Sequence, residues 1–254
     1  MATGVLLAVV CVVFLGALSR STLGFGDAVV SMPLLALLPI PLDLAVALMG
    51  LVGVTIALVV VVTGWRHIDW RLLRPILLAV VFGVPIGLLI LRYTSATVVT
   101  EILGWVLMAY GIFSLTKQWR SNGVAEPRLL GRWWPYLFGL VAGALGSAYN
   151  FNGIPVAVYG TLRQWPSAKF RSTMQGYFLV SGSIVVTGQA LSGMWNRELW
   201  MLYGWSLPAM GGALVAGNLL HRRIPRGTFQ RVVLSFIVIL GLLLVVKSRR
   251  AFSI

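Results

Sequence analysis

Two polar clusters interrupt an otherwise apolar chain, and their side chains are suited to binding a small anion. In the first cluster, Arg20 and Asp27 flank Gly24 and Gly26. Arginine presents a planar fork of N–H groups that matches carboxylate or sulfonate oxygens. An ionisable group beyond a long apolar run is costly, and this usually marks a function. We therefore predict that Arg20 contacts an anion, with a structural pair to Asp27, or a side chain reaching back to the surface, as the alternatives.

Asp27 stands where a helix is expected to restart, and two roles are open to it. Aspartate is a favourable N-cap residue, because its side chain accepts from free backbone N–H groups. A buried carboxylate beside a cation can also take up and release a proton. Asp27 is therefore the candidate for proton coupling, with helix capping as the alternative.

The second cluster combines Gly146 with Tyr149, Asn150 and Asn152. The two amides can each donate and accept hydrogen bonds, and the tyrosine offers a ring and a hydroxyl. We predict that these residues contact the same substrate, with capping of the backbone as the alternative.

Both clusters lie in a Gly-x8-Pro pattern, which runs from Gly24 to Pro33 and again from Gly146 to Pro155. Glycine tolerates unusual backbone angles, and proline breaks the helical ladder, so together they allow a helix to stop and restart. In a membrane such a break must face protein or a wet cavity. The restarted helix directs free N–H groups and its positive dipole end at that space, which favours an anion. Tight packing plus a proline kink is the alternative for either pattern alone.

The elements around these clusters are those of a membrane protein. Of the 254 residues, 59% are apolar and 10% are charged, against about 25% charged in soluble domains. A spanning helix needs roughly 20 apolar residues. Six stretches qualify: 44–63, 72–91, 98–116, 173–191, 199–219 and 228–246. Two interrupted regions, 2–39 and 133–162, are each expected to hold two shorter helices around the Gly-x8-Pro pattern.

The two halves of the chain match each other in order. Gly64 pairs with Gly193, and further pairs follow at a constant offset: Trp70 with Trp200, Gly87 with Gly217, Arg92 with Arg222, and Gly111 with Gly241. Duplicated units that each open with a broken helix are typical of secondary transporters. We predict an all-α integral membrane fold of two inverted repeats, each with one broken or re-entrant helix pair plus three transmembrane helices. The first repeat is 1–116, a cytoplasmic connector is 117–134, and the second repeat is 135–254.

The charge distribution predicts the orientation. The net charge is +14, and most of the 20 Lys and Arg residues fall in four short loops, a distribution typical of cytoplasmic loops and lipid contacts rather than of nucleic-acid binding. With those loops inside, the second half is inverted and both termini are periplasmic. Arg163, Lys169 and Arg171 follow the second broken pair, so we predict that they form an inner vestibule that attracts anions, with an orientation signal alone as the alternative.

Other chemistry finds little support in the sequence. The single cysteine, Cys11, supports neither a disulfide nor a metal site and is expected to be a packed core thiol. Neither a metalloprotease nor a nucleotide-binding motif is present, so we expect no cofactor, no metal and no enzymatic activity. Gln175 and Gln189 are expected to bond to neighbouring helices, and Glu101 to form a surface pair with Arg92.

The arrangement of these motifs resembles the TauE/SafE family, also called TSUP, of sulfite and sulfonate exporters. That family carries a glycine-rich signature near the start of each of two repeated halves. Here the matching segments run from Gly24 through Gly26-Asp27-Ala28 to Pro33, and from Gly146 through Ala148-Tyr149-Asn150 to Pro155. The resemblance implies a bacterial inner-membrane protein that moves small sulfur-containing or organic anions outward. Polar side chains replace glycines in both segments, which favours a substrate other than plain sulfite.

From these observations we predict a secondary transporter, or permease, for a sulfur-containing oxyanion, a sulfonate or an organic acid. Its expected partners are the anion, H⁺ and membrane lipids, and a homodimer is one open possibility for its assembly. We expect alternating access around the paired broken helices and export coupled to the proton gradient. An anion channel or leak pathway without coupling is the alternative.

Overall fold

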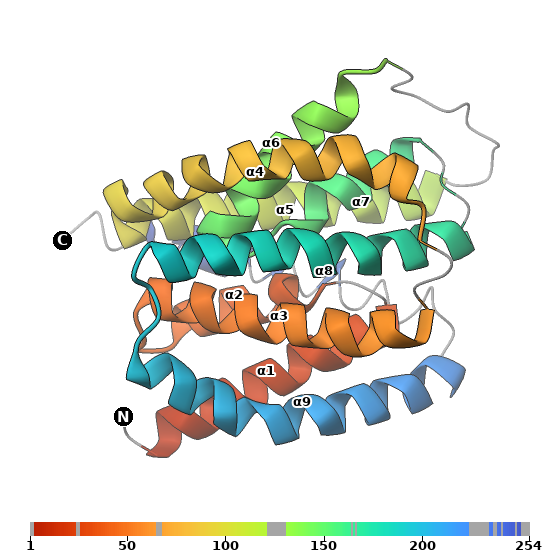
Figure 1. The fold of residues 1–254 in the computed structure, drawn as a ribbon. Helices are drawn as coiled ribbons and strands as arrows, with labels where there is room; N and C mark the ends of the chain where they lie inside the picture. Colours follow the sequence, from red (N-terminus) through yellow and green to blue (C-terminus); the bar gives the residue numbers. More distant parts are fainter. Residues whose placement is uncertain are drawn as a thin grey trace. The chain divides into compact units, whose positions relative to one another are not determined.

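The structure is a computed structural model, and it describes residues 3–23, 26–64, 68–120, 131–163, 165, 167–223, 234–235, 238–239, 241–246 and 248–249. Every labelled element within those ranges is a helix (Figure 1). In chain order they are α1 (Thr3–Leu23), α2 (Asp27–Leu37), α3 (Leu42–Gly64), α4 (Trp70–Tyr93), α5 (Ala96–Arg120), α6 (Trp134–Tyr149), α7 (Gly153–Leu162), α8 (Ser167–Leu191) and α9 (Arg197–Arg223).

Four of the described helices are long and apolar enough to cross a membrane. Their apolar spans are Thr3–Thr22, Leu42–Val62, Trp70–Tyr93 and Arg197–Gly217. The last three overlap the stretches expected from the sequence, whereas part of the stretch 228–246 lies outside the described residues. The chain is therefore a helical, multi-pass membrane protein.

The two broken regions differ in length. In the second, α6 and α7 have 16 and 10 residues, so both are short, as expected. In the first, α2 has 11 residues, but α1 has 21, which is enough to span about 30 Å. The expectation of two short pieces is therefore wrong for α1, because its apolar run continues unbroken up to the polar residues around Arg20.

α8 has 25 residues and is long enough to span, but it is absent from the four apolar spans. Its polar residues Thr173, Ser181 and Gln189 are all fully buried. α8 packs against both α6 and α7, so protein rather than lipid covers these groups. A helix enclosed by other helices can carry polar side chains that a lipid-facing helix cannot.

The chain forms two compact units, and neither follows the halves expected from the sequence. Unit 1 contains residues 1–45, 93–124 and 204–254, and unit 2 contains residues 46–92 and 125–203. Unit 1 therefore holds the first broken pair, and unit 2 holds the second. Since spatial grouping and internal duplication are separate properties, the division into repeats stays a prediction.

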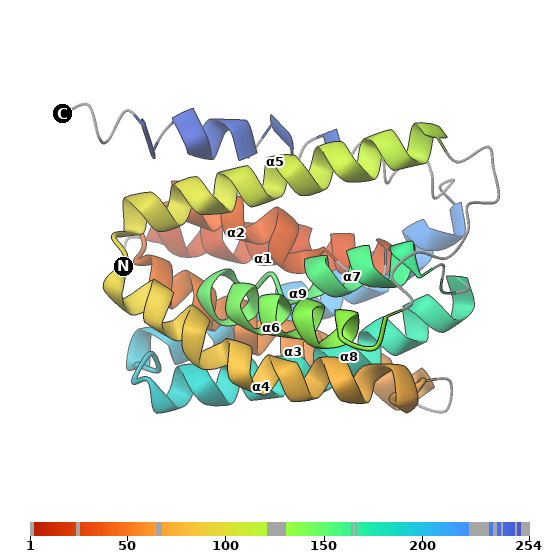
Figure 2. The same ribbon diagram turned by 90° about the horizontal axis from the view of Figure 1, so that it is seen from above.

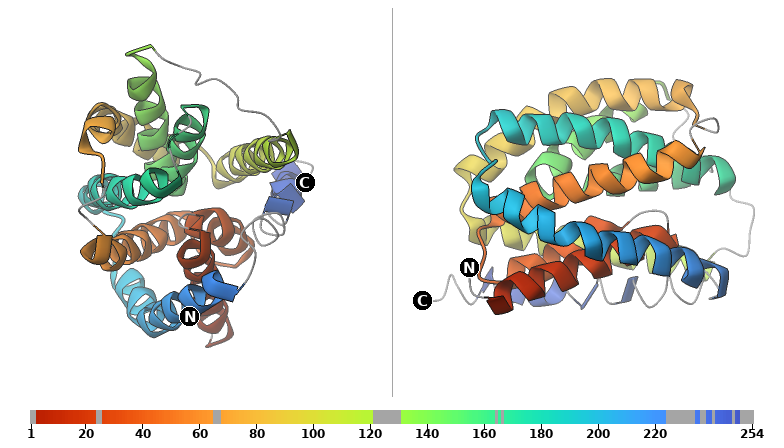
Figure 3. Two further views of the ribbon diagram at one scale, coloured as in Figure 1. Left: turned by 90° about the vertical axis from the view of Figure 1, so that its right-hand side faces the viewer. Right: turned by 60° about the horizontal axis from the view of Figure 1, so that its bottom comes forward.

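In unit 1, α1 and α2 form an antiparallel hairpin. The Ser31 hydroxyl donates to the Val12 carbonyl at 3.1 Å, and a Cβ on Gly16 would lie 2.8 Å from the Asp27 carbonyl oxygen. α9 lies against α1, where Gly217 leaves room for Ser21 (Figure 3). The helical residues 241–246 lie along α5, with Gly104 and Gly241 in close backbone contact (Figure 2).

In unit 2, several helices pack closely on one another through glycines. α4 approaches α6 so closely that a Cβ on Gly83 would lie 2.9 Å from the Ala144 backbone nitrogen. Ser147 on α6 donates to the Val84 carbonyl at 2.9 Å and reinforces this contact. α3 meets α8, where a Cβ on Gly182 would lie 2.9 Å from a Val54 methyl group.

The expectation for the single cysteine is wrong. Cys11 is exposed rather than packed in the core. The reason is that an apolar residue on a membrane helix can face lipid as readily as protein. Glu101 pairs with Arg249, at 3.5 Å, and the expected surface pair with Arg92 stays a prediction. Arg249 also lies 6.0 Å from the centre of the Trp105 ring.

Candidate anion site

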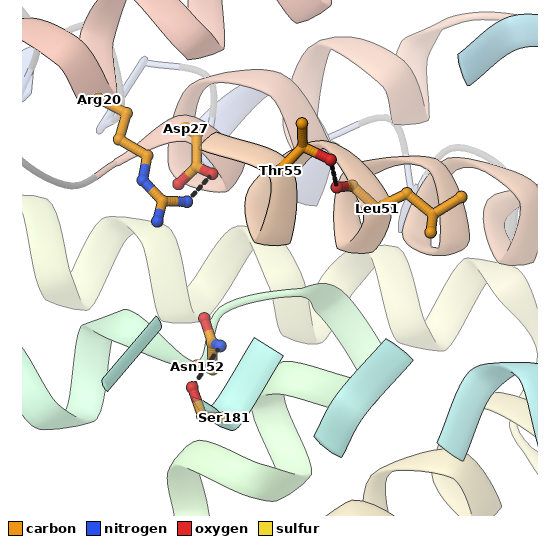
Figure 4. Close-up of polar contacts among 6 residues, drawn as sticks. All are labelled: Arg20, Asp27, Leu51, Thr55, Asn152 and Ser181. Carbon is orange, nitrogen blue, oxygen red and sulfur yellow. Dashed lines mark hydrogen bonds and ion pairs between the residues drawn. The ribbon is translucent and has the colours of Figure 1, made fainter. Parts of the chain in front are cut away.

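The first hairpin contains a buried ion pair. The Arg20 Nη1 atom on α1 donates to the Asp27 Oδ2 atom on α2 at 2.6 Å, and the two side chains are 2% and 10% exposed (Figure 4). The structural pair, one of the alternatives for Arg20, is therefore present.

The turn before α2 depends on glycine. Gly26 has φ 101°, in the left-handed region that glycine adopts without strain. It occupies the N-cap position, and Asp27 follows as the first residue of α2. Capping by Asp27 is thus wrong, because its carboxylate is bound to Arg20. Gly24 lies outside the described residues.

The second hairpin turns at Asn150. Asn150 has φ 62° and is the one described non-glycine residue with a positive φ. Its backbone N–H donates to the Gly146 carbonyl at 2.8 Å and so ends α6. A Cβ on Gly146 would lie 2.8 Å from the Cβ of Asn152. Gly146 is therefore needed for the returning chain to pass close to α6.

Asn152 is held by α8. Its Nδ2 atom donates to the Ser181 hydroxyl at 3.1 Å (Figure 4), and its carbonyl accepts from the Tyr177 hydroxyl at 3.0 Å. Tyr149 is 2% exposed, yet its hydroxyl has no hydrogen-bond partner among the described residues. Of the side chains in this cluster, Tyr149 is the one with an unused buried polar atom.

The predicted vestibule is described for one residue. Arg163 is half-buried at the end of α7, and its backbone N–H donates to the Tyr159 carbonyl at 2.9 Å. Lys169 and Arg171 fall in the first turns of α8, but their side chains lie outside the described residues. The vestibule stays a prediction.

Two buried polar residues, Ser19 and Gln189, have surroundings that the sequence does not predict. Ser19, beside Arg20, is 4% exposed, and its hydroxyl has no partner in the described part of the chain. Gln189 is fully buried against Gly50, and neither atom of its amide has a described partner, so its expected bond to a neighbouring helix is wrong. Sequence position alone distinguishes neither residue from an ordinary helix-packing residue.

The two hairpins carry different polar groups. Within the described ranges, no group of three or more His, Cys, Asp or Glu side chains is placed to hold a metal ion. The first hairpin has a cation, a carboxylate and a helix N-terminus in one unit, and the second has amides and a tyrosine in the other. Whether the two turns face a common site stays a prediction.

These features define the class of the protein. Broken helices that enclose charged and polar groups in a multi-pass helical chain are typical of membrane transporters. The sequence model of the sulfite exporter TauE/SafE family matches residues 8–244. The chain belongs to this family of membrane transporters. A search of curated proteins and a search of solved structures each found no match.

Proposed function

We propose that the chain is a secondary transporter that exports a small sulfur-containing oxyanion, a sulfonate or an organic acid. The observation that carries the proposal is the buried Arg20–Asp27 pair at the start of α2. It supplies a cation where an anion would enter and a carboxylate that competes for that cation. Gly24, Gly26 and Asp27 in the first hairpin, and Gly146, Tyr149, Asn150 and Asn152 in the second, complete the proposed substrate site.

Competition between substrate and carboxylate provides proton coupling. With Asp27 ionised, its oxygen occupies the Arg20 Nη1 atom at 2.6 Å. Protonation of Asp27 removes that charge and releases Arg20 to a substrate oxyanion, since a guanidinium prefers an ionised partner. Anion affinity then rises as the pH falls, so Asp27 links the anion to an H⁺ that moves in the same direction, and outward transport by this route is driven by an outward anion gradient.

The packing of matched glycines supports the inverted-repeat architecture. Gly87 on α4 lies against Ala144 and Ser147 on α6, and its sequence counterpart Gly217 on α9 lies against Leu18 and Ser21 on α1. α4, from the first half of the sequence, therefore packs on α6 from the second half, and α9, from the second half, packs on α1 from the first. A twofold relation between the halves requires this reciprocal packing.

The orientation follows from the basic loops. We place them in the cytoplasm of a bacterial inner-membrane protein, with both termini in the periplasm, because positive loops are retained inside. Arg163, Lys169 and Arg171 then line an inner vestibule, where they raise the local anion concentration before export. Alternating movement of one helix bundle against another carries the anion across the membrane.

The proposal is tested with the purified full chain in liposomes. Uptake of sulfite, thiosulfate, methanesulfonate and a small carboxylate is measured with and without the same anion inside. A carrier shows saturation, and its uptake accelerates when the vesicles are preloaded. Failure to move any of these anions would refute the proposal.

The same assay addresses the second candidate, an anion channel or leak, which the shared broken helices would also permit. A channel shows no acceleration by internal anion and no saturation in the same concentration range. Arg249→Ala is the matched control for cation loss, because Arg249 is exposed, with 68% of its side chain accessible. Its transport is expected to equal that of the unaltered protein.

A further inference from the structure

The hydroxyl groups of the first hairpin fall into two kinds. Ser21 and Thr22 donate to the Leu18 carbonyl at 3.0 and 2.7 Å, and Ser31 donates to the Val12 carbonyl at 3.1 Å. These three satisfy their hydrogens within the protein. The Ser19 hydroxyl has no partner among the described residues, although Ser19 is 4% exposed. A buried polar group without a partner costs free energy, so its presence calls for a physical explanation.

Ser19 points at the start of α2. A Cβ built on Gly26 would lie 3.5 Å from the Ser19 Oγ atom, and Gly26 is the residue that immediately precedes the first turn of α2. The N–H groups of a first helical turn have no intrahelical partners, and they carry the positive end of the helix dipole. The unbonded Ser19 hydroxyl, the first turn of α2 and the buried Arg20 therefore belong to one small region of unit 1.

We infer that Ser19 is a substrate-contacting residue that donates its hydroxyl hydrogen to one oxygen of a multi-oxygen anion. The inference rests on the proposed function, because it assumes that the anion binds at the start of α2. The inference adds Ser19 to that site and gives the site a basis for selecting oxyanions over halides. A sulfite or sulfonate group has several oxygens and can accept from Ser19, from α2 and from Arg20 at once. A halide has one centre and cannot use three separated donors equally well.

Gly26 has a second role in this arrangement. Any side chain at this position would begin 3.5 Å from the Ser19 hydroxyl, in van der Waals contact with it. Glycine therefore leaves the hydroxyl open to a ligand. This explains why a bare backbone at this position matters to binding as well as to the left-handed turn.

The test compares two serine variants of the full-length protein in detergent. Sulfite and methanesulfonate are titrated by calorimetry, with chloride as the single-centre probe. Ser19→Ala should bind the two oxyanions roughly ten-fold more weakly, as expected for one hydrogen bond to a charged group, and should leave the chloride response unchanged. Because no bond within the protein is lost, its ligand-free melting temperature should not fall.

Ser31→Ala is the matched control, because Ser31 is a buried serine of the same hairpin whose hydroxyl is already bonded. It should lower the ligand-free melting temperature and leave oxyanion affinity unchanged. Unchanged affinity in Ser19→Ala would overturn the inference, as would a loss of melting temperature equal to that of Ser31→Ala. If the unaltered protein binds none of the oxyanions, the proposed function fails instead.

Discussion

At the residue scale, the Arg20–Asp27 pair combines structural and functional demands. Both side chains are almost completely buried, and removing one partner of such a pair leaves an uncompensated charge, at a cost of about 3–5 kcal/mol. Replacing both partners with apolar residues of similar volume is often neutral. Stability and transport can therefore be separated by comparing single with double substitutions.

Arg20→Ala should abolish transport while the protein still inserts into the membrane, with a loss of about 3–5 kcal/mol of stability. The double variant Arg20→Leu with Asp27→Leu should recover most of that stability but no transport, because the cation is absent. Thermal unfolding in detergent and liposome uptake provide the two readouts. Transport by the double variant would show that Arg20 is structural alone.

Asp27→Asn tests proton coupling. The amide cannot lose a proton in the physiological range, so anion affinity should stop rising as the pH falls. The measurement is the pH profile of uptake between about pH 5 and 8, with Arg249→Ala as the variant that keeps the normal profile. A pH response like that of the unaltered protein would leave Asp27 with a purely structural role.

At the element scale, the turn between α6 and α7 depends on the left-handed residue Asn150. Asparagine tolerates this conformation, whereas a residue with an ordinary Cβ pays roughly 1–2 kcal/mol. Asn150→Ala should therefore lower the melting temperature, and Asn150→Gly should preserve it. If Asn150→Gly folds normally but transports poorly, the side chain contacts the substrate; equal stability of the two variants would refute the conformational argument.

The contact of α4 with α6 is the second testable element. At Gly83 a Cβ would meet the Leu140 carbonyl and the Ala144 backbone, and backbone cannot move aside easily. Gly83→Val should cost about 1–3 kcal/mol through overpacking. Gly211→Val is the matched control, because a Cβ at Gly211 would meet nothing within 4 Å. If both variants unfold at the same temperature, α4 and α6 are not in close contact.

At the scale of the whole molecule, membrane orientation can be measured directly. Cys11 is the single cysteine of the chain, so Cys11→Ser provides a background for new cysteines. With the basic loops inside, Arg71→Cys should react with a membrane-permeant reagent alone. Ser95→Cys, in the turn between α4 and α5, should react with an impermeant reagent added outside. The reverse labelling pattern would invert the proposed topology.

The composition of the two units also belongs to this scale. Each unit combines segments from both expected halves of the chain. The predicted pairing of Gly64 with Gly193 and of Gly87 with Gly217 rests on their order along the sequence. It does not identify their neighbours, because long-range packing depends on how helices from different parts of the chain come together.

Much of the site could be predicted from local sequence. Gly26 predicts the helix break that the structure shows, since glycine tolerates a positive φ. Arg20 is recognisable as a candidate site residue because it is a charge that follows a long apolar run. The unbonded Ser19 and Tyr149 hydroxyls could not be predicted, because a serine or tyrosine in a helix usually finds a partner. Asn152 was singled out, but its bond to Ser181 joins residues on different helices.

The sequence by itself determined the membrane class, the family and the two helix breaks, because apolarity, glycine and proline act on their own segments of chain. The tertiary structure alone decided that Asp27 binds Arg20 instead of capping α2, and that Ser19 keeps a free hydroxyl beside Gly26. The physical reason is that a side chain's hydrogen-bond partner depends on which atoms packing brings within about 3 Å. Residue order along the chain does not specify that distance.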